Sequence, residues 1–280
     1  DGNQDKMLRV ITTHLNVFIL KTWPKITLLD PRYISAKKTL FKLVNEVIEN
    51  HQNDTFPEPG LINDLIKARR ENPALLDDDD LIANAFIPFS AGVDTAGNIM
   101  ATTLYCILKN KDVYDKIKEE VNQYLPDKNV SLNDIKNLKY TIATMMEALR
   151  HYPIAYNLIR YVKKDNEYKG FKIPANSVAL IPISLQHNND KYFKEPQKFA
   201  PERFMAPRNE HRQKHAFLPF GFGAHKCSGA NLAEAMVSLN IAYLIKNYQF
   251  DFDRSKKVTF TYNPMTTMSD SFTLSLTGKP

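Results

Sequence analysis

One stretch of this 280-residue sequence contains a cysteine in a setting that suits cofactor chemistry. His225 and Lys226 precede Cys227, glycines at positions 221, 223 and 229 free the backbone around it, and a predicted helix begins just after it. Cations and a helix N-terminus both stabilise a thiolate, which is the form of cysteine that binds metals. These residues predict a thiolate-ligated cofactor.

Two kinds of cofactor compete for this cysteine. Histidines and the cysteine could together supply four zinc ligands, two of them one helical turn apart: His211, His215, His225 and Cys227. Against zinc, Phe217, Phe220 and Phe222 place apolar bulk beside the sulfur, which suits a flat hydrophobic macrocycle better than a bare ion. The many glycines also indicate close approach of a planar group. The macrocycle is favoured, and zinc stays open as the alternative.

Composition excludes several classes of protein. The sequence is 43% hydrophobic and 24% charged, which is typical of a globular protein with a real core. Its two cysteines, Cys106 and Cys227, lie far apart, so neither a disulfide framework nor a four-cysteine zinc site is available, and a reducing compartment is expected. A net charge of +6 is too small to indicate nucleic-acid binding. The sequence starts at Asp1 without a recognisable signal peptide, and we expect an excerpt or a processed product.

The pattern of apolar residues predicts a mainly α protein with a small β portion, an α+β class, in a single domain over 1–280. Helical periodicity dominates residues 1–153, mixed β and loop signals cover 154–228, and a helix followed by a β tail covers 229–280. Helices are expected over residues 31–50, 61–70, 81–108, 112–125, 131–152 and 229–247. Strands are expected over 159–162, 168–173, 178–183 and around a turn at Asn263–Pro264.

The segment 81–108 carries the one polar feature that stands out among the helices. Asp94 is its only charge, and the segment is long enough to cross a bilayer. Scattered polar residues and an acidic flank at Asp77–Asp80 favour instead a helix buried all round within a protein. Taken alone, Asp94 and Thr95 are more typical of a helix whose Asp pairs elsewhere and whose Thr is simply packed. Beside the Cys227 loop, the carboxylate and the hydroxyl indicate a functional pair.

Residues 220–229, Phe-Gly-Phe-Gly-Ala-His-Lys-Cys-Ser-Gly, resemble the haem-binding loop of the cytochrome P450 family, F-G-x-G-x-(R/H)-x-C-x-G. Three more motifs follow the family's order. Ala91-Gly-Val-Asp-Thr95 resembles its oxygen-activating helix segment, Glu147-Ala-Leu-Arg150 its E-x-x-R, and Pro201-Glu-Arg-Phe204 its P-E-R-F. The resemblance covers essentially the whole chain, as the C-terminal portion of a P450-like fold with the N-terminal part absent.

The resemblance implies roles for individual residues around haem b, iron protoporphyrin IX. Cys227 would be the proximal iron ligand. Phe220 would tune the reduction potential of the iron. His225 and Arg160 would pair with the haem propionates. Further cofactor-binding positions are implied in the loop and in the central helix, where small residues leave room for the ring and for dioxygen: Gly221, Gly229, Ala91 and Gly92. An ion-pair scaffold beneath the haem would be formed by Glu147, Arg150 and Arg203.

The resemblance also implies catalytic and substrate contacts. Asp94 and Thr95 would relay protons to dioxygen. A lipophilic pocket would be lined by three residues of the central helix, Phe86, Phe89 and Ser90, and by the segments 154–158 and 265–268. His187 is interpreted as structural.

The expected activity is that of a monooxygenase that uses O2 and electrons from a flavoprotein reductase or ferredoxin to oxidise a lipophilic small molecule. The donor would dock on a basic cluster near the cysteine: Arg203, Arg208, Arg212, Lys214 and Lys226. The protein would lie on the cytoplasmic side, soluble or anchored by an N-terminal segment not present here. Two alternatives remain: a haem-thiolate isomerase or dehydratase that acts on peroxides, and a truncated, non-catalytic binding or scaffold protein.

Overall fold

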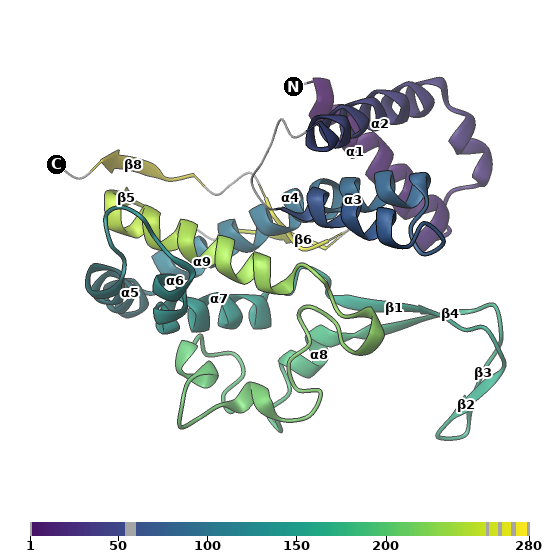
Figure 1. Ribbon diagram of the computed structural model, residues 1–280. Helices are drawn as coiled ribbons and strands as arrows, with labels where there is room; N and C mark the ends of the chain where they lie inside the picture. The colour runs from purple at the N-terminus through teal and green to yellow at the C-terminus, as the bar shows by residue number, and fades with distance from the viewer. Residues whose placement is uncertain (1, 54–59, 256–257, 263–264, 270–272, 279–280) are drawn as a thin grey trace. The chain divides into compact units, whose positions relative to one another are not determined.

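The computed structural model describes residues 2–53, 60–255, 258–262, 265–269 and 273–278 (Figure 1). The chain divides into two compact units, Asp1–Asp94 and Thr95–Pro280. The boundary falls inside the longest helix, α4 (Asp78–Lys109). Each unit is described by itself.

The first unit is helical, as the apolar periodicity predicts. α2 (Pro31–Gln52) buries a stripe of residues at helical spacing, among them Tyr33, Leu40 and Val44. Asp30 caps this helix, because its carboxylate accepts the Arg32 N–H at 2.8 Å. The other described elements of this unit are helical as well: α1 (Gly2–His14), the π-helical η1 (Leu15–Ile19), the 3-10 helix η2 (Lys25–Leu29), α3 (Leu61–Glu71) and the first half of α4.

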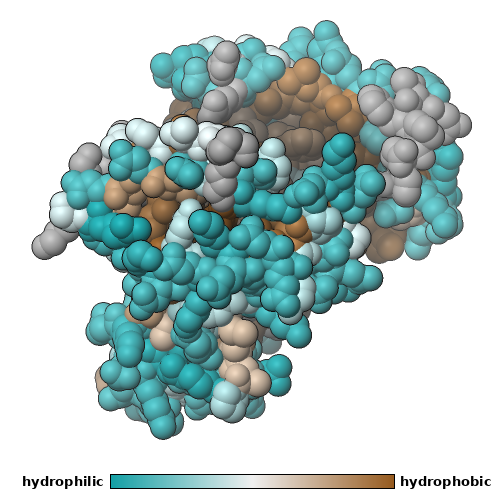
Figure 2. All heavy atoms as spheres, turned by 90° about the vertical axis from the view of Figure 1, so that its left-hand side faces the viewer, coloured by the Kyte–Doolittle hydropathy of each residue, from teal (hydrophilic) through white to brown (hydrophobic). Residues whose placement is uncertain are grey.

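The second unit packs its helices around α7 (Lys139–His151), which contacts α5 (Lys111–Tyr124), α9 (Ala230–Asn247) and the 3-10 helix η3 (Pro201–Phe204). The core between them is fully buried at Ile117, Met145 and Ile241. Figure 2 views the side on which α5 lies and shows a largely hydrophilic surface there, as expected of an amphipathic helix. The unit also contains α6 (Leu132–Asn137), α8 (Ile183–His187) and the 3-10 helices η4 (Glu210–Arg212) and η5 (Gly223–His225).

The single helix expected over 131–152 is wrong. The Ser131–Asp134 capping box is present and starts α6, but the helix ends at Asn137 and α7 begins at Lys139. Leu138 lies between them in a non-helical conformation and is fully buried. Because burial of a leucine contributes about 2 kcal/mol, packing against the core outweighs one lost turn of helix.

Within the described residues, the strands form four two-stranded antiparallel sheets. The strand expected over 168–173 is wrong, because the chain turns at Lys169 and Gly170, both with positive φ, and forms a hairpin. Asn263–Pro264 lies outside the described residues. The pairs are β1 (Asn157–Tyr161) with β4 (Val178–Pro182), β2 (Asn166–Tyr168) with β3 (Phe171–Ile173), β5 (Tyr248–Asp251) with β8 (Ser275–Gly278), and β6 (Phe260–Thr261) with β7 (Thr267–Met268).

α4 is not buried all round, contrary to expectation. Its C-terminal half enters the core at Ile99 and Ile107, but Phe89 and Val93 in the first half are each 54% exposed. Over the described residues, no helix is both long and apolar enough to span a membrane. A predominantly α fold with a small β portion is confirmed.

Glu120 on α5 provides a cap for α7 that the sequence pattern does not reveal. Its carboxylate accepts the backbone N–H groups of Tyr140 at 2.6 Å and Thr141 at 2.8 Å, and also the buried Thr141 hydroxyl. Negative charge at a helix N-terminus is stabilising, and these donors would otherwise be unsatisfied.

We expect Glu120→Ala to lower the free energy of unfolding by about 2 kcal/mol, because it leaves buried donors without a partner. Urea denaturation measures the change. The exposed neighbour Glu119 is the matched control, and Glu119→Ala should alter stability by less than about 0.5 kcal/mol. Equal effects of both substitutions would contradict the capping role.

Candidate functional site

The loop that carries Cys227 is a tight turn closed by backbone hydrogen bonds. The Cys227 N–H donates to the Phe220 carbonyl at 2.8 Å, and Gly221 and Gly223 take φ values of +71° and +67°. The positive φ of Gly221 favours glycine at this position, whereas a Cβ there would make only an ordinary 3.4 Å contact with the His225 carbonyl oxygen. Cys227 is exposed and lies two residues before Gly229, the N-cap of α9.

The aromatic residues of the loop differ in their surroundings. Phe217 and Phe220 pack against the main core of the second unit, and Phe217 contacts Phe204 edge to face at 4.7 Å. Phe222 is instead 40% exposed and contacts His215. The loop is therefore anchored by apolar packing on one side while its thiol faces outward.

A fully buried charge cluster joins α7 to the 3-10 helix η3, which precedes this loop in the chain. The Arg150 guanidinium forms a two-pronged ion pair with Glu147, at 2.7 and 2.9 Å, and Arg203 Nε lies 3.3 Å from the same carboxylate. The expected ion pairs of these three residues are thus present. Burial raises the pKa of Glu147, but hydrogen bonds from Arg150 and His151 outweigh this effect and lower it overall. The carboxylate remains ionised at neutral pH.

His187 connects this charge cluster to the cysteine loop, a structural role as expected, although its partners could not be identified from the sequence. Arg150 Nη1 donates to the His187 carbonyl at 2.8 Å, and His187 Nε2 accepts the Leu218 N–H at 2.9 Å. Nδ1 therefore carries the ring proton. Burial, together with the Arg150 charge, lowers the pKa of His187 to about 4. The neutral ring needed to hold Leu218 is the stable form at neutral pH.

The basic cluster expected to attract an electron donor is partly wrong. Arg203 is fully buried and paired with Glu147 and Glu210, so it faces no partner protein. Arg208 also pairs with Glu210. Exposed cations remain at Arg212, Lys214 and Lys226.

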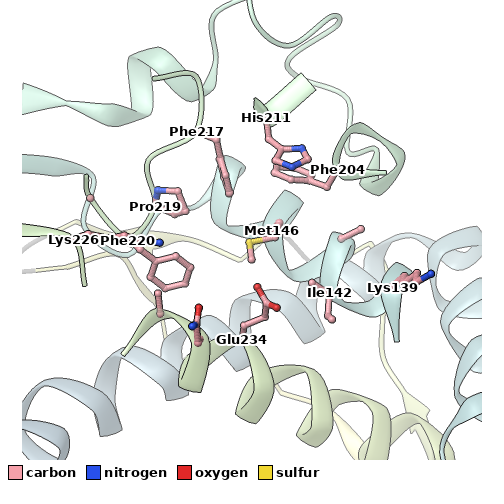
Figure 3. Close-up of a pocket in the computed structure, with 14 residues that line it drawn as sticks. Lys139, Ile142, Met146, Phe204, His211, Phe217, Pro219, Phe220, Lys226 and Glu234 are labelled. Carbon is pink, nitrogen blue, oxygen red and sulfur yellow. The ribbon is translucent and has the colours of Figure 1, made fainter. Parts of the chain in front are cut away.

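A cavity of about 370 Å³ lies between α7, α9 and the cysteine loop (Figure 3). Met146, Phe217 and Phe220 contribute apolar lining, while Glu234 adds a carboxylate whose pKa is raised by burial. Lys226, which belongs to the expected basic cluster, also lines it, and Lys139 of α7 adds one cation that the sequence analysis did not include. The hollow combines an apolar wall with positive charge.

The remaining predicted cofactor contacts lie in different parts of the chain. His225 is exposed in η5, and Arg160 lies in β1, where Nη1 donates to the Ile159 carbonyl at 2.8 Å. Thr95 belongs to the same unit as Cys227. Ala91, Gly92 and Asp94 belong to the first unit, and their approach to the cysteine remains a prediction.

Two of the three segments expected to line a substrate pocket do meet. The Thr266 N–H donates to the Ile154 carbonyl at 2.9 Å, and the Thr266 hydroxyl donates to the Pro153 carbonyl. The Asn98 amide contacts the Met265 sulfur at 3.8 Å. Residues 265–266, the chain after α7 and the second half of α4 are thus held together in one unit.

The site fits a thiolate-ligated planar group better than zinc. Within the described part of the chain, no three His, Cys, Asp or Glu side chains gather as metal ligands, and the four zinc candidates are not brought together. His211 stacks on Phe204 at 5.0 Å. Cys227 instead offers a single exposed thiol beyond a turn of positive-φ glycines, and one cysteine is enough to hold haem iron.

Comparisons with known proteins agree with this geometry. The cytochrome P450 family profile matches residues 3–275, so this chain belongs to the cytochrome P450 family. It is 30% identical over 237 residues to probable cytochrome P450 6a18 of Drosophila melanogaster, covering 80% of this chain and 47% of that protein. Cytochrome P450 3A41 of Mus musculus is 30% identical over 65% of the chain and 36% of its own length. Cyclooctat-9-en-7-ol 5-monooxygenase of Streptomyces melanosporofaciens is 27% identical to it, over 78% of this chain and 48% of the length of that enzyme. The chain thus spans less than half the length of these relatives.

His187 also makes the stability of the loop dependent on pH. Its folded pKa of about 4 lies below the unfolded value of about 6.5, so the unfolded chain takes up the proton first as pH falls. Its contribution is complete above pH 6.5 and is lost progressively toward pH 4, by on the order of 3 kcal/mol.

We expect His187→Gln to flatten the pH dependence of unfolding between pH 6.5 and 4.5, because an amide oxygen can still accept the Leu218 N–H without titrating. His187→Leu should additionally speed hydrogen exchange at Leu218. Urea denaturation across pH and amide exchange provide the two measurements. The exposed His215 is the control, and a wild-type pH profile in His187→Gln would contradict this role.

Proposed function

We propose that this chain provides the haem-thiolate portion of a monooxygenase that transfers one oxygen atom of O2 to a lipophilic substrate. The observation that carries the proposal is the exposed Cys227 thiol at the end of a glycine turn that is anchored to the core. A reactive cysteine must be both accessible and held in place. Cys106 is the opposite case, since it is buried and its thiol pKa is raised by burial.

Haem b is the cofactor that these residues fit. Bound haem supplies the redox chemistry of iron, and Cys227 would be the protein's ligand to it. His225 and Arg160 would pair with the propionates. Arg160 uses one N–H on the Ile159 carbonyl, and the other guanidinium donors could bind a carboxylate. Gly92 would leave space for the ring, since a Cβ there meets no atom within 4 Å.

Thr95 and Asp94 are proposed to handle protons. A hydroxyl can both accept and donate a proton, and a carboxylate on the adjacent residue can replenish it. Both side chains are only partly exposed on a helix whose next turn enters the core at Ile99. A partly enclosed site limits free exchange of protons with bulk water, which favours delivery through named side chains.

The cavity between α7, α9 and the cysteine loop supports docking of an acidic electron donor. Lys226 belongs to the loop itself, and Lys139 lies on α7 at the same hollow. Exposed Arg212 and Lys214 add positive charge in the segment that leads into the loop. Such a surface would steer a flavoprotein reductase or a ferredoxin with a negative face.

The ligand assignment predicts a spectroscopic signature. After reconstitution with haemin and reduction, the protein should give a thiolate-type Soret band in its CO difference spectrum, and Cys227→Ala should lose that band. Cys106→Ala is the matched control and should retain it, because this residue is buried in the core. Persistence of the thiolate band in Cys227→Ala would overturn the proposed function.

The monooxygenase assignment predicts a role for the Thr95 hydroxyl. With NADPH, a flavoprotein reductase and a panel of lipophilic compounds, Thr95→Ala should lower O2-dependent product formation roughly 100-fold while binding of the compounds is unchanged. Thr103→Ala, on the same helix but fully buried, should behave like the wild type. Turnover of a lipid hydroperoxide without any electron donor, insensitive to Thr95→Ala, would instead support the isomerase or dehydratase alternative.

A further inference from the structure

One carboxyl group in the cavity beside the cysteine loop has no partner. Glu234 lies on α9 and lines the cavity, and its side chain forms neither an ion pair nor a hydrogen bond with any described residue. Burial alone raises the pKa of this carboxyl group, so no neighbouring cation compensates its charge. Removing a carboxylate from water without a hydrogen-bond donor is costly. The position therefore favours a donor supplied by another molecule.

Apolar side chains form the wall around this carboxyl group. Met146 of α7 contributes to it, together with Phe217 and Phe220, and Figure 3 shows the Glu234 side chain pointing from α9 toward Met146. These three apolar residues are only partly buried. A cavity of about 370 Å³ is large enough for a ligand-sized group, since such sites begin at about 300 Å³. An occupant must therefore combine apolar surface with a hydrogen-bond donor.

Two lysines lie at opposite ends of the cavity. Lys226 comes from the cysteine loop and Lys139 from the start of α7, and Figure 3 shows them on either side of Glu234. Both are exposed, and neither forms an ion pair with a described residue. Burial lowers the pKa of His211, the remaining titratable residue of the lining, so its ring adds no charge at neutral pH. The ends of the cavity therefore attract anionic groups and disfavour a cationic occupant.

We propose that this cavity receives an acidic segment of the electron donor in which a tyrosine lies between acidic residues. The tyrosine ring packs on the apolar wall, its hydroxyl donates to Glu234, and the flanking acids pair with Lys139 and Lys226. A phenol is uncharged, so the lysines do not repel it, and its hydroxyl lies at the far end of the ring. This inference rests on the proposed docking of an acidic donor and adds the residue type that the cavity selects.

Peptides test this selection without turnover. We expect a fluorescein-labelled peptide with one tyrosine between two glutamate triplets to bind the haemin-loaded chain about tenfold more tightly than its phenylalanine counterpart, because a hydrogen bond to a carboxylate is lost. A peptide with alanine at the same position should bind more weakly still, since it also lacks the ring. Fluorescence polarisation measures the three dissociation constants.

Substitution of Glu234 separates the hydrogen bond from general attraction. In Glu234→Leu the tyrosine and phenylalanine peptides should bind equally, because no acceptor remains. Glu234→Gln keeps the shape of the side chain but only a neutral acceptor, so its preference for tyrosine should fall between those of the wild type and Glu234→Leu. Glu119→Leu, at an exposed position of α5, is the matched control and should keep the full preference. Circular dichroism verifies that each variant is folded.

Substitution of the lysines tests the ends of the cavity. Lys139→Ala and Lys226→Ala should each weaken binding of the tyrosine and phenylalanine peptides by a similar factor, in a salt-dependent manner, and leave the preference for tyrosine unchanged. Lys118→Ala, at an exposed position of α5 outside the cavity lining, should bind both peptides like the wild type.

The outcomes distinguish this inference from the proposed function on which it rests. Equal binding of the tyrosine and phenylalanine peptides to the wild type, or a preference for tyrosine that survives in Glu234→Leu, would overturn the inference. The docking of an acidic donor would still stand if binding depended on Lys139 and Lys226. Peptide binding that is absent, or that is insensitive to both lysines, would overturn the docking surface and this inference together.

Discussion

The buried carboxylate of Glu147 is the interaction on which the second unit depends. Removing a charge from water is costly, and the cost is offset only when partners surround it completely. Here Arg150, Arg203 and the Ala200 N–H all contact this carboxylate, and neither guanidinium is exposed. The cluster therefore joins α7 to η3 and to the irregular chain that leads toward the cysteine loop. Loss of the Glu147 carboxylate would leave the Arg150 guanidinium buried without the carboxylate that it binds at 2.7 and 2.9 Å.

A chain of hydrogen bonds runs from this cluster to the site of chemistry. Arg150 binds the His187 carbonyl, the His187 ring binds the Leu218 N–H, and Leu218 accepts the Gly221 N–H at the turn that ends with Cys227. The two bonds of His187 are short and at least partly buried, so water competes little for their donors and acceptors. The thiol can remain exposed because these hydrogen bonds hold the backbone that carries it. The Cys227 side chain is therefore accessible while the backbone of its loop is fixed by hydrogen bonds.

Local patterns were sufficient for much of this architecture. The apolar stripe of α2, the Ser131–Asp134 capping box and the glycines around Cys227 act over a few residues, and the structure agrees with each. The cysteine loop was also recognisable because its chemistry requires residue types at close, constant spacing. The same holds for Glu147 and Arg150, which are one helical turn apart and meet on one face of α7.

Other features depended on residues that are distant in sequence. The break at Leu138, the cap from Glu120, the burial of Arg203 and the ring bond of His187 each join segments whose separation along the chain says nothing about their distance in space. A sequence shows which side chains can carry charge, bind iron or hydrogen-bond, because those properties belong to the residue. Only tertiary packing decides which of them are withdrawn from water, since burial depends on what the rest of the chain places around them.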